Sequence, residues 1–532
     1  MKKIVYILSA ALALTLSSCA GWLDVNKDPN AVTDVDNGLI IPAVELNLLN
    51  ASGFYGHMFG SFFAEHYAIK PGGPQYLGLA HWDTSDATPL TANFVNYFYI
   101  SAMVRVCNNA AIICSKASET ESWGDYLAAT VLRVYALQML VDGLGEMPYS
   151  EAGNTAILAP KYDDGKTIYA GLVKELDNAL AKVSASDKVS DNMVFESSSD
   201  VDNWIRFANA LKLRILMREH GAVDVKAQLA ALVSQDKFPL SDIAYAGCWA
   251  NQAGLDNPVY SEVVRKRGDI NTGRTIEICA HMAVTSVMNE VADPRRAAKF
   301  LPSFGHGNTW DGAFIDDQYS KEITAKYVDA DTYAEVNFKY DTPVYLITVA
   351  ETQFFLAEYY SSVAPDAAKA KAAYEAAIDA SFATHGCTSA QAAALYAGGA
   401  KYAWNASKAN ELIGIQKWIH LAHVNGYESW CEIRRLGYPQ FNAKSGADLY
   451  KEWAKLAKSR VEAGNDNPTP LTADLVSAGL YKIGTLVTPP NVASGMPANT
   501  LVARLPYPKY STDRNENAPE RKPATEKLFW AK

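Results

Sequence analysis

The sequence predicts an all-α protein, built on a tetratricopeptide-like scaffold of helical hairpins that carries long loops. Three observations support this fold class. Apolar residues recur at helical spacing in many segments, strand-like alternation is scarce, and the stretches between the helical segments are rich in proline, glycine and aromatic residues. At 532 residues, the chain has ample length for a large hydrophobic core.

The chain begins with a predicted lipoprotein signal peptide, residues 1–18. Two lysines precede an apolar stretch, residues 4–16, which is too short to span a bilayer comfortably. The sequence LSSC that ends at Cys19 resembles a bacterial lipobox, which places cleavage before Cys19 and diacylglycerol on its thiol. Several acyl chains anchor a protein firmly. The alternatives are an ordinary secretory signal and a small amino-terminal anchor.

We expect residues 19–35 to form a lipidated tether and residues 36–532 to form a single helical domain with loop insertions. The formal net charge is −10 and no basic cluster stands out, so nucleic acid is not an expected partner. No second apolar run is expected to reach membrane-spanning length, since Arg105 interrupts residues 100–114. The cysteines after Cys19 include no CxxC pair, which argues against a metal knuckle.

Five segments place apolar residues on one helical face. The faces are formed by Ala128, Leu132, Tyr135 and Met139; by Leu172, Leu176, Ala179 and Val183; by Trp204, Ala208, Leu211 and Ile215; by Leu346, Ala350, Phe354 and Ala357; and by Leu412, Ile415, Ile419 and Ala422. Gly143, Gly145 and Pro148 predict the end of the first of these helices. Segments 125–148 and 366–383 loosely resemble tetratricopeptide hairpins, although no strict period is visible.

Long loops are predicted at residues 70–91, 247–275, 301–342 and 462–525. Long ordered loops on a helical scaffold usually carry function.

Several short motifs follow one another along nearly the whole chain. They are Leu23-Asp24-Val25-Asn26-Lys27-Asp28-Pro29-Asn30, Asp142-Gly143-Leu144-Gly145-Glu146-Met147-Pro148-Tyr149, Trp204-Ile205-Arg206-Phe207-Ala208-Asn209-Ala210, Asp293-Pro294-Arg295, Glu351-Thr352-Gln353-Phe354-Phe355, Gln416-Lys417-Trp418, Arg434-Arg435-Leu436-Gly437-Tyr438-Pro439 and Arg504-Leu505-Pro506-Tyr507-Pro508. In this order they resemble the SusD/RagB family of nutrient-binding outer-membrane lipoproteins, in the branch that begins with a DxNxDPN segment.

The resemblance implies a helical fold with tetratricopeptide-like hairpins. It also implies a lipoprotein at the surface of a Bacteroidetes-type, Gram-negative outer membrane. Such a protein caps a TonB-dependent β-barrel transporter of the SusC type and delivers a glycan or a peptide to it. Leu144 and Trp418 depart from the family pattern, in which an aromatic residue is common at position 144 and tyrosine is more usual at position 418.

The residues themselves give these motifs a mainly structural role. Four arginines lie in helical, half-apolar surroundings, where we expect ion pairs with buried acids rather than ligand contacts. They are Arg206, Arg214, Arg434 and Arg435, with Glu351 and Glu358 as candidate partners.

The sequence contains no recognised catalytic motif, so an enzyme is not predicted. His420 and His423 are three residues apart on a predicted helix, but no third metal ligand is in view, and core or surface histidines are favoured over a metal site. A glycosidase needs two acids flanking a sugar cleft, and sequence alone does not place such a pair. No cofactor is predicted, and a structural calcium ion stays an open alternative.

The candidate ligand-binding residues lie in loops that mix aromatic rings with polar groups, because sugar faces stack on rings and sugar hydroxyls bond to polar side chains. They are Tyr76, His81, Trp82 and Asp83 in the first loop, Trp249 in the second, and Asn308, Trp310 and Asp311 in the third. For each tryptophan the alternative is packing against the scaffold.

The expected function is therefore a surface lipoprotein that binds an oligosaccharide and works with a TonB-dependent barrel. A peptide is the main alternative ligand, and the aromatic loops favour a glycan over it. Two other classes stay open: a surface glycoside hydrolase, and a structural lipoprotein that binds no small ligand.

Overall fold

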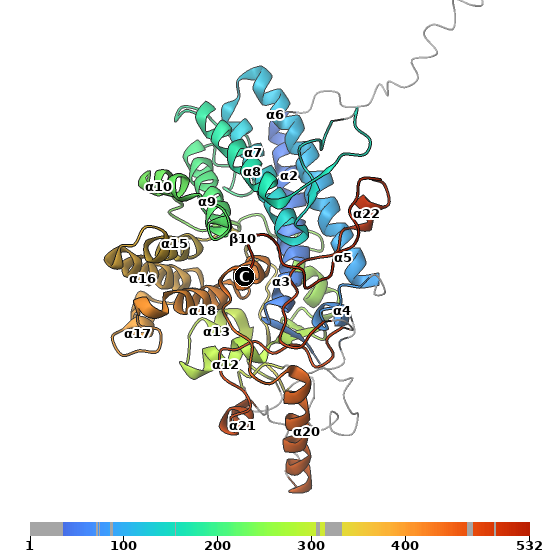
Figure 1. The fold of residues 1–532 in the computed structure, drawn as a ribbon, viewed down its shortest axis with the longest axis vertical. Helices are drawn as coiled ribbons and strands as arrows, with labels where there is room; N and C mark the ends of the chain where they lie inside the picture. The colour runs from blue at the N-terminus through green and yellow to red at the C-terminus, as the bar shows by residue number, and fades with distance from the viewer. Residues whose placement is uncertain are drawn as a thin grey trace, which may run out of the picture.

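The computed structural model describes residues 36–70, 73, 75–85, 89–154, 156–304, 309–313, 332–464, 472–493 and 496–532, and only the backbone of residues 89–92. Cys19, the lipobox and the tether lie outside the described residues. Helices dominate the described chain and the strands are short (Figure 1), which confirms the predicted all-α fold class.

The first half of the chain forms one group of helices, several of which pack against α7. These elements are α2 (Asn37–Asn50), η1 (Ala51–Gly56), α3 (His57–Phe63), α4 (Leu77–Ala80), α5 (Pro89–Tyr99), η2 (Ile100–Cys107), α6 (Asn108–Thr120), α7 (Trp123–Leu144), α8 (Gly165–Lys182), α9 (Val201–Glu219), α10 (Lys226–Ser234), α11 (Pro258–Tyr260) and η3 (Ser261–Arg265).

The second half adds further helices on both sides of this group. They are α12 (Met282–Glu290), α13 (Arg296–Lys299), α15 (Val349–Glu358), η4 (Tyr359–Val363), α16 (Ala367–Thr384), α17 (Ser389–Tyr396), η5 (Ala406–Lys408), α18 (Ala409–Leu421), α19 (Gly426–Leu436), α20 (Gly446–Glu462), α21 (Thr472–Ser477) and α22 (Lys509–Thr512). Helices α15 and α16 pack as a hairpin, as do α18 and α19, while α20 extends away from the body (Figure 1).

Ten short strands complete the described structure. They are β1 (Tyr67–Ile69), β2 (Met147–Pro148), β3 (Tyr162–Asp163), β4 (Ile243–Tyr245), β5 (Gly268–Asp269), β6 (Arg274–Thr275), β7 (Ile278–Ala280), β8 (Phe300–Leu301), β9 (Glu335–Val336) and β10 (Val344–Ile347). One four-stranded sheet has the order β1-β7-β9-β8, and three strand pairs join β10 to β4, β2 to β3, and β5 to β6.

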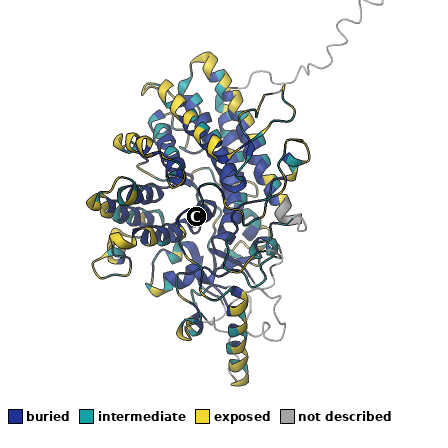
Figure 2. Cartoon of the chain, in the orientation of Figure 1, coloured by how far each residue is buried: buried dark blue, intermediate teal, exposed yellow. Residues whose placement is uncertain are grey.

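Helix α7 lies at the centre of the helices formed by the first half of the chain and packs against α6, α8 and α9. It ends as the sequence predicts, because Gly145 takes the positive φ of 81° that favours glycine, and its N–H bonds to the Val141 carbonyl. In the most apolar window of this helix, 94% of the residues are buried. Figure 2 shows buried residues along α7 and exposed residues on the outer faces of α10, α16 and α20.

Two helical stretches, Asn93–Thr120 and Trp123–Leu144, are long and apolar enough to cross a membrane, judged by length and composition. This differs from the expectation that no second run reaches that length. The second stretch is α7, whose burial marks it as a core helix. The first joins α5, η2 and α6 into one continuous helix that packs on α2 and α7, so its apolar face also meets the protein interior.

One helix begins later than the apolar pattern predicts. Leu346 belongs to strand β10, not to the helix that contains Ala350 and Phe354. The boundary is set by Thr348, whose side chain accepts a hydrogen bond from the Glu351 N–H and so caps α15 at its N-terminus.

Buried ion pairs connect the two halves of the fold. On α9, the Arg214 Nε lies 2.7 Å from Glu351 Oε1 on α15 and 3.7 Å from Glu428 Oε2 on α19. One turn further along α9, Arg218 donates to Asp142 of α7 and to Glu428. All five side chains are at most 2% exposed, so each charge depends on its partners.

The same network continues on the α15, α18 and α19 side. Arg435 Nη2 lies 2.6 Å from Glu358 Oε2 and 2.7 Å from Glu432 Oε2, and Lys417 Nζ lies 2.9 Å from Glu432. Burial alone would raise the pKa of Glu358, but Arg435 above all lowers it to about 2. The expectation that arginines pair with buried acids such as Glu351 and Glu358 is therefore confirmed for Arg214 and Arg435.

The two other predicted arginines behave differently. Arg434 donates to the backbone carbonyls of Asp142 and Ala503, both at 2.8 Å, so it fastens the C-terminal coil to α19. Arg206 pairs with Asp202 one helical turn away, at a half-buried position. None of the four arginines therefore depends on a ligand for its partner.

Helices α3 and α19 approach so closely that only glycine fits between them. A Cβ added to Gly60 would lie 2.1 Å from the Gly426 backbone, and a Cβ on Gly426 would lie 2.2 Å from Ser61 Oγ. This contact places α3, and strand β1 directly after it, against the helices that hold the ion network.

Replacing Arg214 by alanine tests the network. We expect Arg214→Ala to lower the free energy of unfolding by about 3–5 kcal/mol, because Glu351 and Glu428 stay buried with one cation fewer. Urea unfolding followed by circular dichroism measures the change. The control is Lys455→Ala on α20, which removes an exposed pair with Glu452 and should cost less than about 1 kcal/mol. Equal effects of the two substitutions would contradict a structural role for the network.

Candidate functional site

The four-stranded sheet brings together three loops that are far apart in the sequence. Strand β1 leads into residues 70–85, β7 follows residues 267–277, and β8 leads into residues 302–313. Tyr67 lies opposite Ala280 across the first strand pair. We call the described residues of these three loops, together with Glu335 of β9, the loop cluster.

Buried ion pairs hold the loop cluster to the sheet. Glu335, which is fully buried, accepts from Lys70 at 3.0 Å and from Arg274 at 2.6 Å. Glu277 accepts a hydrogen bond from the Gln75 N–H at 3.1 Å. Each of the three loops is thus bound to the sheet or to a neighbouring loop, which fixes their relative positions.

Phe304 presents an aromatic ring at the surface of the loop cluster. Its exposed fraction is 65%, and the Arg274 guanidinium lies 4.9 Å from its ring centre. Arg274 also donates to the Pro302 carbonyl, so a cation that is anchored to Glu335 supports the ring. The sequence analysis did not select Phe304, although it directly precedes the glycine-rich stretch that contains Asn308, Trp310 and Asp311.

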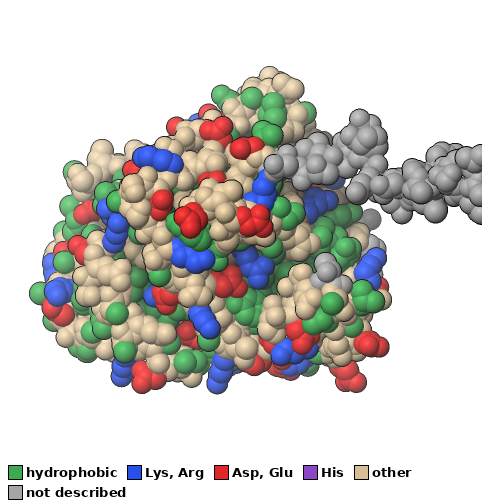
Figure 3. Space-filling model, turned by 90° about the horizontal axis from the view of Figure 1, so that it is seen from above, with side chains coloured by type: hydrophobic (Ala, Val, Ile, Leu, Met, Phe, Trp, Pro, Cys, Tyr) green, Lys and Arg blue, Asp and Glu red, His purple; other side chains and the backbone are tan. Residues whose placement is uncertain are grey.

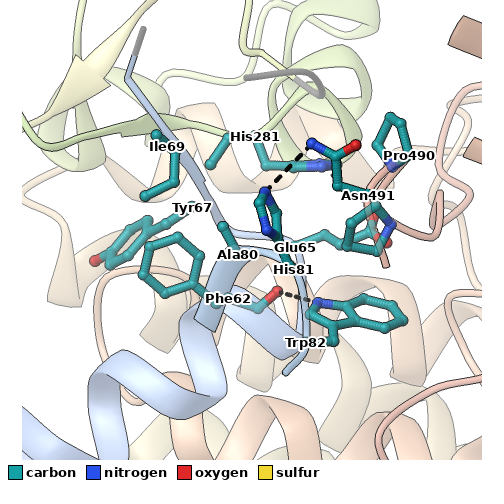
Figure 4. Close-up of a pocket in the computed structure, with 12 residues that line it drawn as sticks. Phe62, Glu65, Tyr67, Ile69, Ala80, His81, Trp82, His281, Pro490 and Asn491 are labelled. Carbon is teal, nitrogen blue, oxygen red and sulfur yellow. Dashed lines mark hydrogen bonds and ion pairs between the residues drawn. The ribbon is translucent and has the colours of Figure 1, made fainter. Parts of the chain in front are cut away.

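Tyr76 and Trp82, two of the predicted ligand-binding residues, are buried instead of forming a platform. Their exposed fractions are 2% and 1%. The Trp82 indole N–H donates to the Phe62 carbonyl at 3.3 Å (Figure 4), and the Tyr76 ring packs against Phe62 and Phe94. Neither ring offers a free face to a sugar, because scaffold side chains cover both.

The cavity beside Trp82 is too small for a sugar. Its volume is about 30 Å³, which leaves room for a few water molecules at most and is about a tenth of the smallest usual ligand pocket, about 300 Å³. Glu65 and His281 line it, 3.5 Å apart (Figure 4). Burial raises the pKa of Glu65 well above its usual value and lowers that of His281 to about 3, so both groups favour their neutral forms.

His81 and Asp83, from the same predicted loop, remain half-buried. The His81 ring points toward Asn491 in Figure 4, with the two side-chain nitrogens 3.5 Å apart. Asp83 accepts a hydrogen bond from the Ser85 N–H at 2.8 Å, which closes a local turn.

Trp310 and Asp311 lie at the far end of the loop cluster, beside α12 and α13. The Arg296 guanidinium lies 5.2 Å from the Trp310 ring centre, and Asn289 donates to the Trp310 carbonyl at 3.2 Å and to Asp311 at 3.4 Å. The half-buried Trp310 thus keeps part of its surface open. Asn308 lies outside the described residues.

Trp249 lies apart from the other candidates, in the segment after β4. Its indole N–H donates to the Tyr245 carbonyl at 3.0 Å and its ring is half-buried. The structure therefore collects the predicted loops at one sheet, but it does not bring those predicted residues that it describes into one pocket.

The paired histidines do not form a metal site with each other. The ring of His420 contacts Thr348 and Ser381, whereas His423 lies beyond the end of α18 and contacts Tyr67 and the Asn337 carbonyl.

One other group of possible metal ligands is found among the described residues, namely Asp142, Glu428 and Cys431. Arg218 donates to both of these carboxylates, so a protein cation already occupies the position that a metal ion would take.

Comparisons with known proteins agree with this architecture. The SusD-like_2 family, described as "Starch-binding associating with outer membrane", matches residues 30–454. A SusD homologue from Bacteroides uniformis has a similar structure, with 20% identity, a TM-score of 0.68, and coverage of 94% of this chain and 100% of the other. A comparison with curated protein sequences gives no significant match.

Two further similar structures have printed functions. One is called a chitin-binding protein, with 18% identity, a TM-score of 0.65, and coverage of 93% of this chain and 100% of the other. Another is a chitin-binding SusD homologue from Flavobacterium johnsoniae, with 18% identity, a TM-score of 0.59, and coverage of 80% and 96%. The structural likeness supports the fold, and the family match extends over most of the sequence, so this chain belongs to the SusD-like family.

Proposed function

We propose that this protein is a surface-exposed lipoprotein that captures an oligosaccharide at the loop cluster and delivers it to a TonB-dependent, SusC-type outer-membrane transporter. Membership of a family described as starch-binding and outer-membrane-associated supports the ligand class and the location. The lipobox at Cys19 supports anchoring by lipid. The chitin-binding description of two similar structures also favours a glycan.

The observation that carries the proposal is the exposed Phe304 ring above an anchored Arg274. Sugar binding combines an aromatic face with fixed polar groups, and Arg274 is held in place by Glu335 and by the Pro302 carbonyl. A rigid platform of this kind loses little conformational entropy when a ligand binds.

A binding role fits the two glutamates of the loop cluster better than a catalytic one. Glu335 and Glu277 are buried, and they face Lys70, Arg274 and backbone N–H groups instead of an open cleft. A glycosidase requires a carboxylic acid and a carboxylate that both reach the scissile bond. The proposal accordingly assigns no enzymatic step to this protein.

The visible surface also fits a sugar ligand better than a nucleic acid. Figure 3 shows one face of the molecule, on which acidic and basic side chains are interspersed. Nucleic-acid-binding proteins instead gather lysine and arginine along one face, and the chain as a whole carries a net charge of −10.

Removing the Phe304 ring tests the proposed platform. We expect Phe304→Ala to weaken oligosaccharide binding about tenfold, since stacking on an aromatic ring contributes about 1 kcal/mol or more. Titration calorimetry with chito-oligosaccharides and malto-oligosaccharides measures the affinity. The matched control is Tyr97→Ala on α5, a ring that is 53% exposed outside the loop cluster and should leave binding unchanged. Unchanged affinity in Phe304→Ala would contradict the platform.

Replacing Trp82 should affect the stability of the protein and not its affinity for the ligand. Trp82→Ala removes a buried ring and should lower the free energy of unfolding by about 3–5 kcal/mol. Urea unfolding measures this loss. At temperatures where the variant stays folded, calorimetry should give nearly the affinity of the unchanged protein, whereas a selective loss of binding with full stability would show that the ring contacts the ligand.

The lipid anchor is tested by Cys19→Ala in cells of a Bacteroidetes species. We expect the substituted protein to leave the membrane fraction, because the diacylglycerol acceptor is gone. Fractionation followed by immunoblotting measures the distribution. Cys248→Ala, a cysteine in the described fold, is the control and should stay with the membrane. Membrane retention of Cys19→Ala, together with no barrel protein in pull-downs, would contradict the proposal.

A further inference from the structure

A second hollow lies on the helical scaffold, and none of its lining residues belongs to the loop cluster. It is bounded by the loop after α17, the start of α18, the residues after α19 and the segment 482–485, and its volume is about 280 Å³. This is close to the lower end of the range of about 300–1,000 Å³ that is usual for small-ligand pockets. The polar and aromatic side chains that matter here are Tyr402, Lys408, Glu411, Tyr438, Gln440 and Lys482.

A buried hydroxyl in the wall of this hollow lacks a partner. Tyr402 is 3% exposed, and among the described residues its Oη has no hydrogen-bond partner. Burial raises the pKa of Tyr402, so the group stays a hydroxyl that can donate or accept a hydrogen bond. An unpaired buried hydroxyl is costly, and a polar ligand in the hollow would supply the missing partner.

Two lysines at the hollow are also free of acidic partners. Lys408 and Lys482 are both exposed, and within the described part of the chain neither amine forms an ion pair. Lys401, at the same hollow, differs because it pairs with Glu290. Glu411 is the single acid in the wall, so the unpaired charges there have a net positive sign.

The start of helix α18 adds to this positive potential. Lys408 occupies the N-cap position of α18 and also ends the short helix η5, whose start is capped by the Asn405 side chain. The N-terminal end of a helix carries partial positive charge, so a cation at the N-cap is unfavourable and an anion is favoured there. A negatively charged ligand would offset both the helix end and Lys408.

Tyr438 gives the hollow an aromatic wall and connects it with a neighbouring space. The ring is half-buried, and its Cβ lies so close to α18 that a side chain on Gly414 would approach it to 2.7 Å. An adjoining hollow of about 290 Å³ shares Lys408, Glu411 and Tyr438 with the 280 Å³ hollow. It adds serine hydroxyls and an asparagine amide. The two hollows provide room for more than one sugar ring.

We propose that this hollow binds a saccharide that carries a carboxylate, such as a uronic acid. The sugar face packs on Tyr438, the carboxylate accepts from Lys408 or Lys482, and the hydroxyls bond to Glu411, Gln440 and Tyr402. The proposal shares the ligand class of the proposed function, but it concerns a separate site, so the test below reads the two sites independently.

The test uses isoleucine methyl groups as local probes in the purified protein. Ile415 and Ile483 line the hollow, whereas Ile270 and Ile276 are exposed in the loop cluster. The protein, labelled at isoleucine δ1-methyl groups, is titrated with glucuronic acid, galacturonic acid, glucose and galactose, and then with chito-oligosaccharides. The expected result is a saturable shift at Ile415 and Ile483 with the acidic sugars, and a weaker response to the neutral sugars.

Absence of shifts at Ile415 and Ile483, or equal shifts with acidic and neutral sugars, would overturn the proposal. A response of Ile270 and Ile276 to chito-oligosaccharides would still leave the proposed function standing. If Ile270 and Ile276 fail to respond while Ile415 and Ile483 do, ligand binding at the loop cluster is contradicted and ligand binding in the hollow is supported. The two failures are therefore distinguishable.

Two conservative substitutions assign the response to the named groups. Tyr402→Phe removes only the unpartnered hydroxyl, and Lys408→Gln replaces the charged amine by a neutral, shorter polar side chain. Each should weaken binding of the acidic sugar about tenfold, because a hydrogen bond to a charged group contributes at least that much and a buried hydroxyl comparably. The controls are Tyr396→Phe, whose hydroxyl bonds to Asp379, and Lys455→Gln on α20. Unchanged affinity in both test variants would overturn the assignment.

Discussion

The buried ion network between α7, α9, α15, α18 and α19 is the constraint on which the rest of this fold depends. Charges in a low-dielectric interior are tolerated only where their partners stand at hydrogen-bonding distance. Arg214 and Arg218 lie one turn apart on α9, so their acids must approach from three different helices. This requirement fixes the rotation of each helix about its axis, which apolar packing alone leaves loosely specified.

The loop cluster repeats this principle on a smaller scale. Lys70, Arg274 and Glu335 come from three separate segments and meet at one buried carboxylate. The sheet is short, and its strands have few backbone hydrogen bonds to hold the loops. The ion pairs hold the loops in place instead, so the surface above them keeps its shape without long helices or strands. The same arrangement supports Phe304 through Arg274.

The scaffold was predictable from the sequence, whereas the surface of the site was not. Helical periodicity and a few arginines among apolar residues were enough to anticipate that buried arginines pair with acids such as Glu351 and Glu358, because a buried charge on a helix must find an opposite charge. Burial of a loop aromatic leaves no comparable pattern. Trp82 and Phe304 both lie in glycine-containing loops, yet one is 1% exposed and the other 65%, since long-range packing decides between them. Leu346 fits a helical face and still lies in a strand, because the cap at Thr348 overrides the periodicity.

The two candidate binding regions differ in how their charges are satisfied, and this difference has consequences for how each would bind. In the loop cluster, Glu335, Lys70 and Arg274 already hold one another, so a ligand there meets a preorganised surface and gains mainly from stacking and hydrogen bonds. In the hollow lined by Tyr402 and Tyr438, Lys408 and Lys482 form no ion pair within the described chain, and the buried Tyr402 hydroxyl has no partner there. A ligand in this hollow would neutralise the lysine charge and give the buried hydroxyl a partner. The affinity of this hollow should therefore depend on the charge of the ligand and on ionic strength far more than the affinity of the loop cluster does.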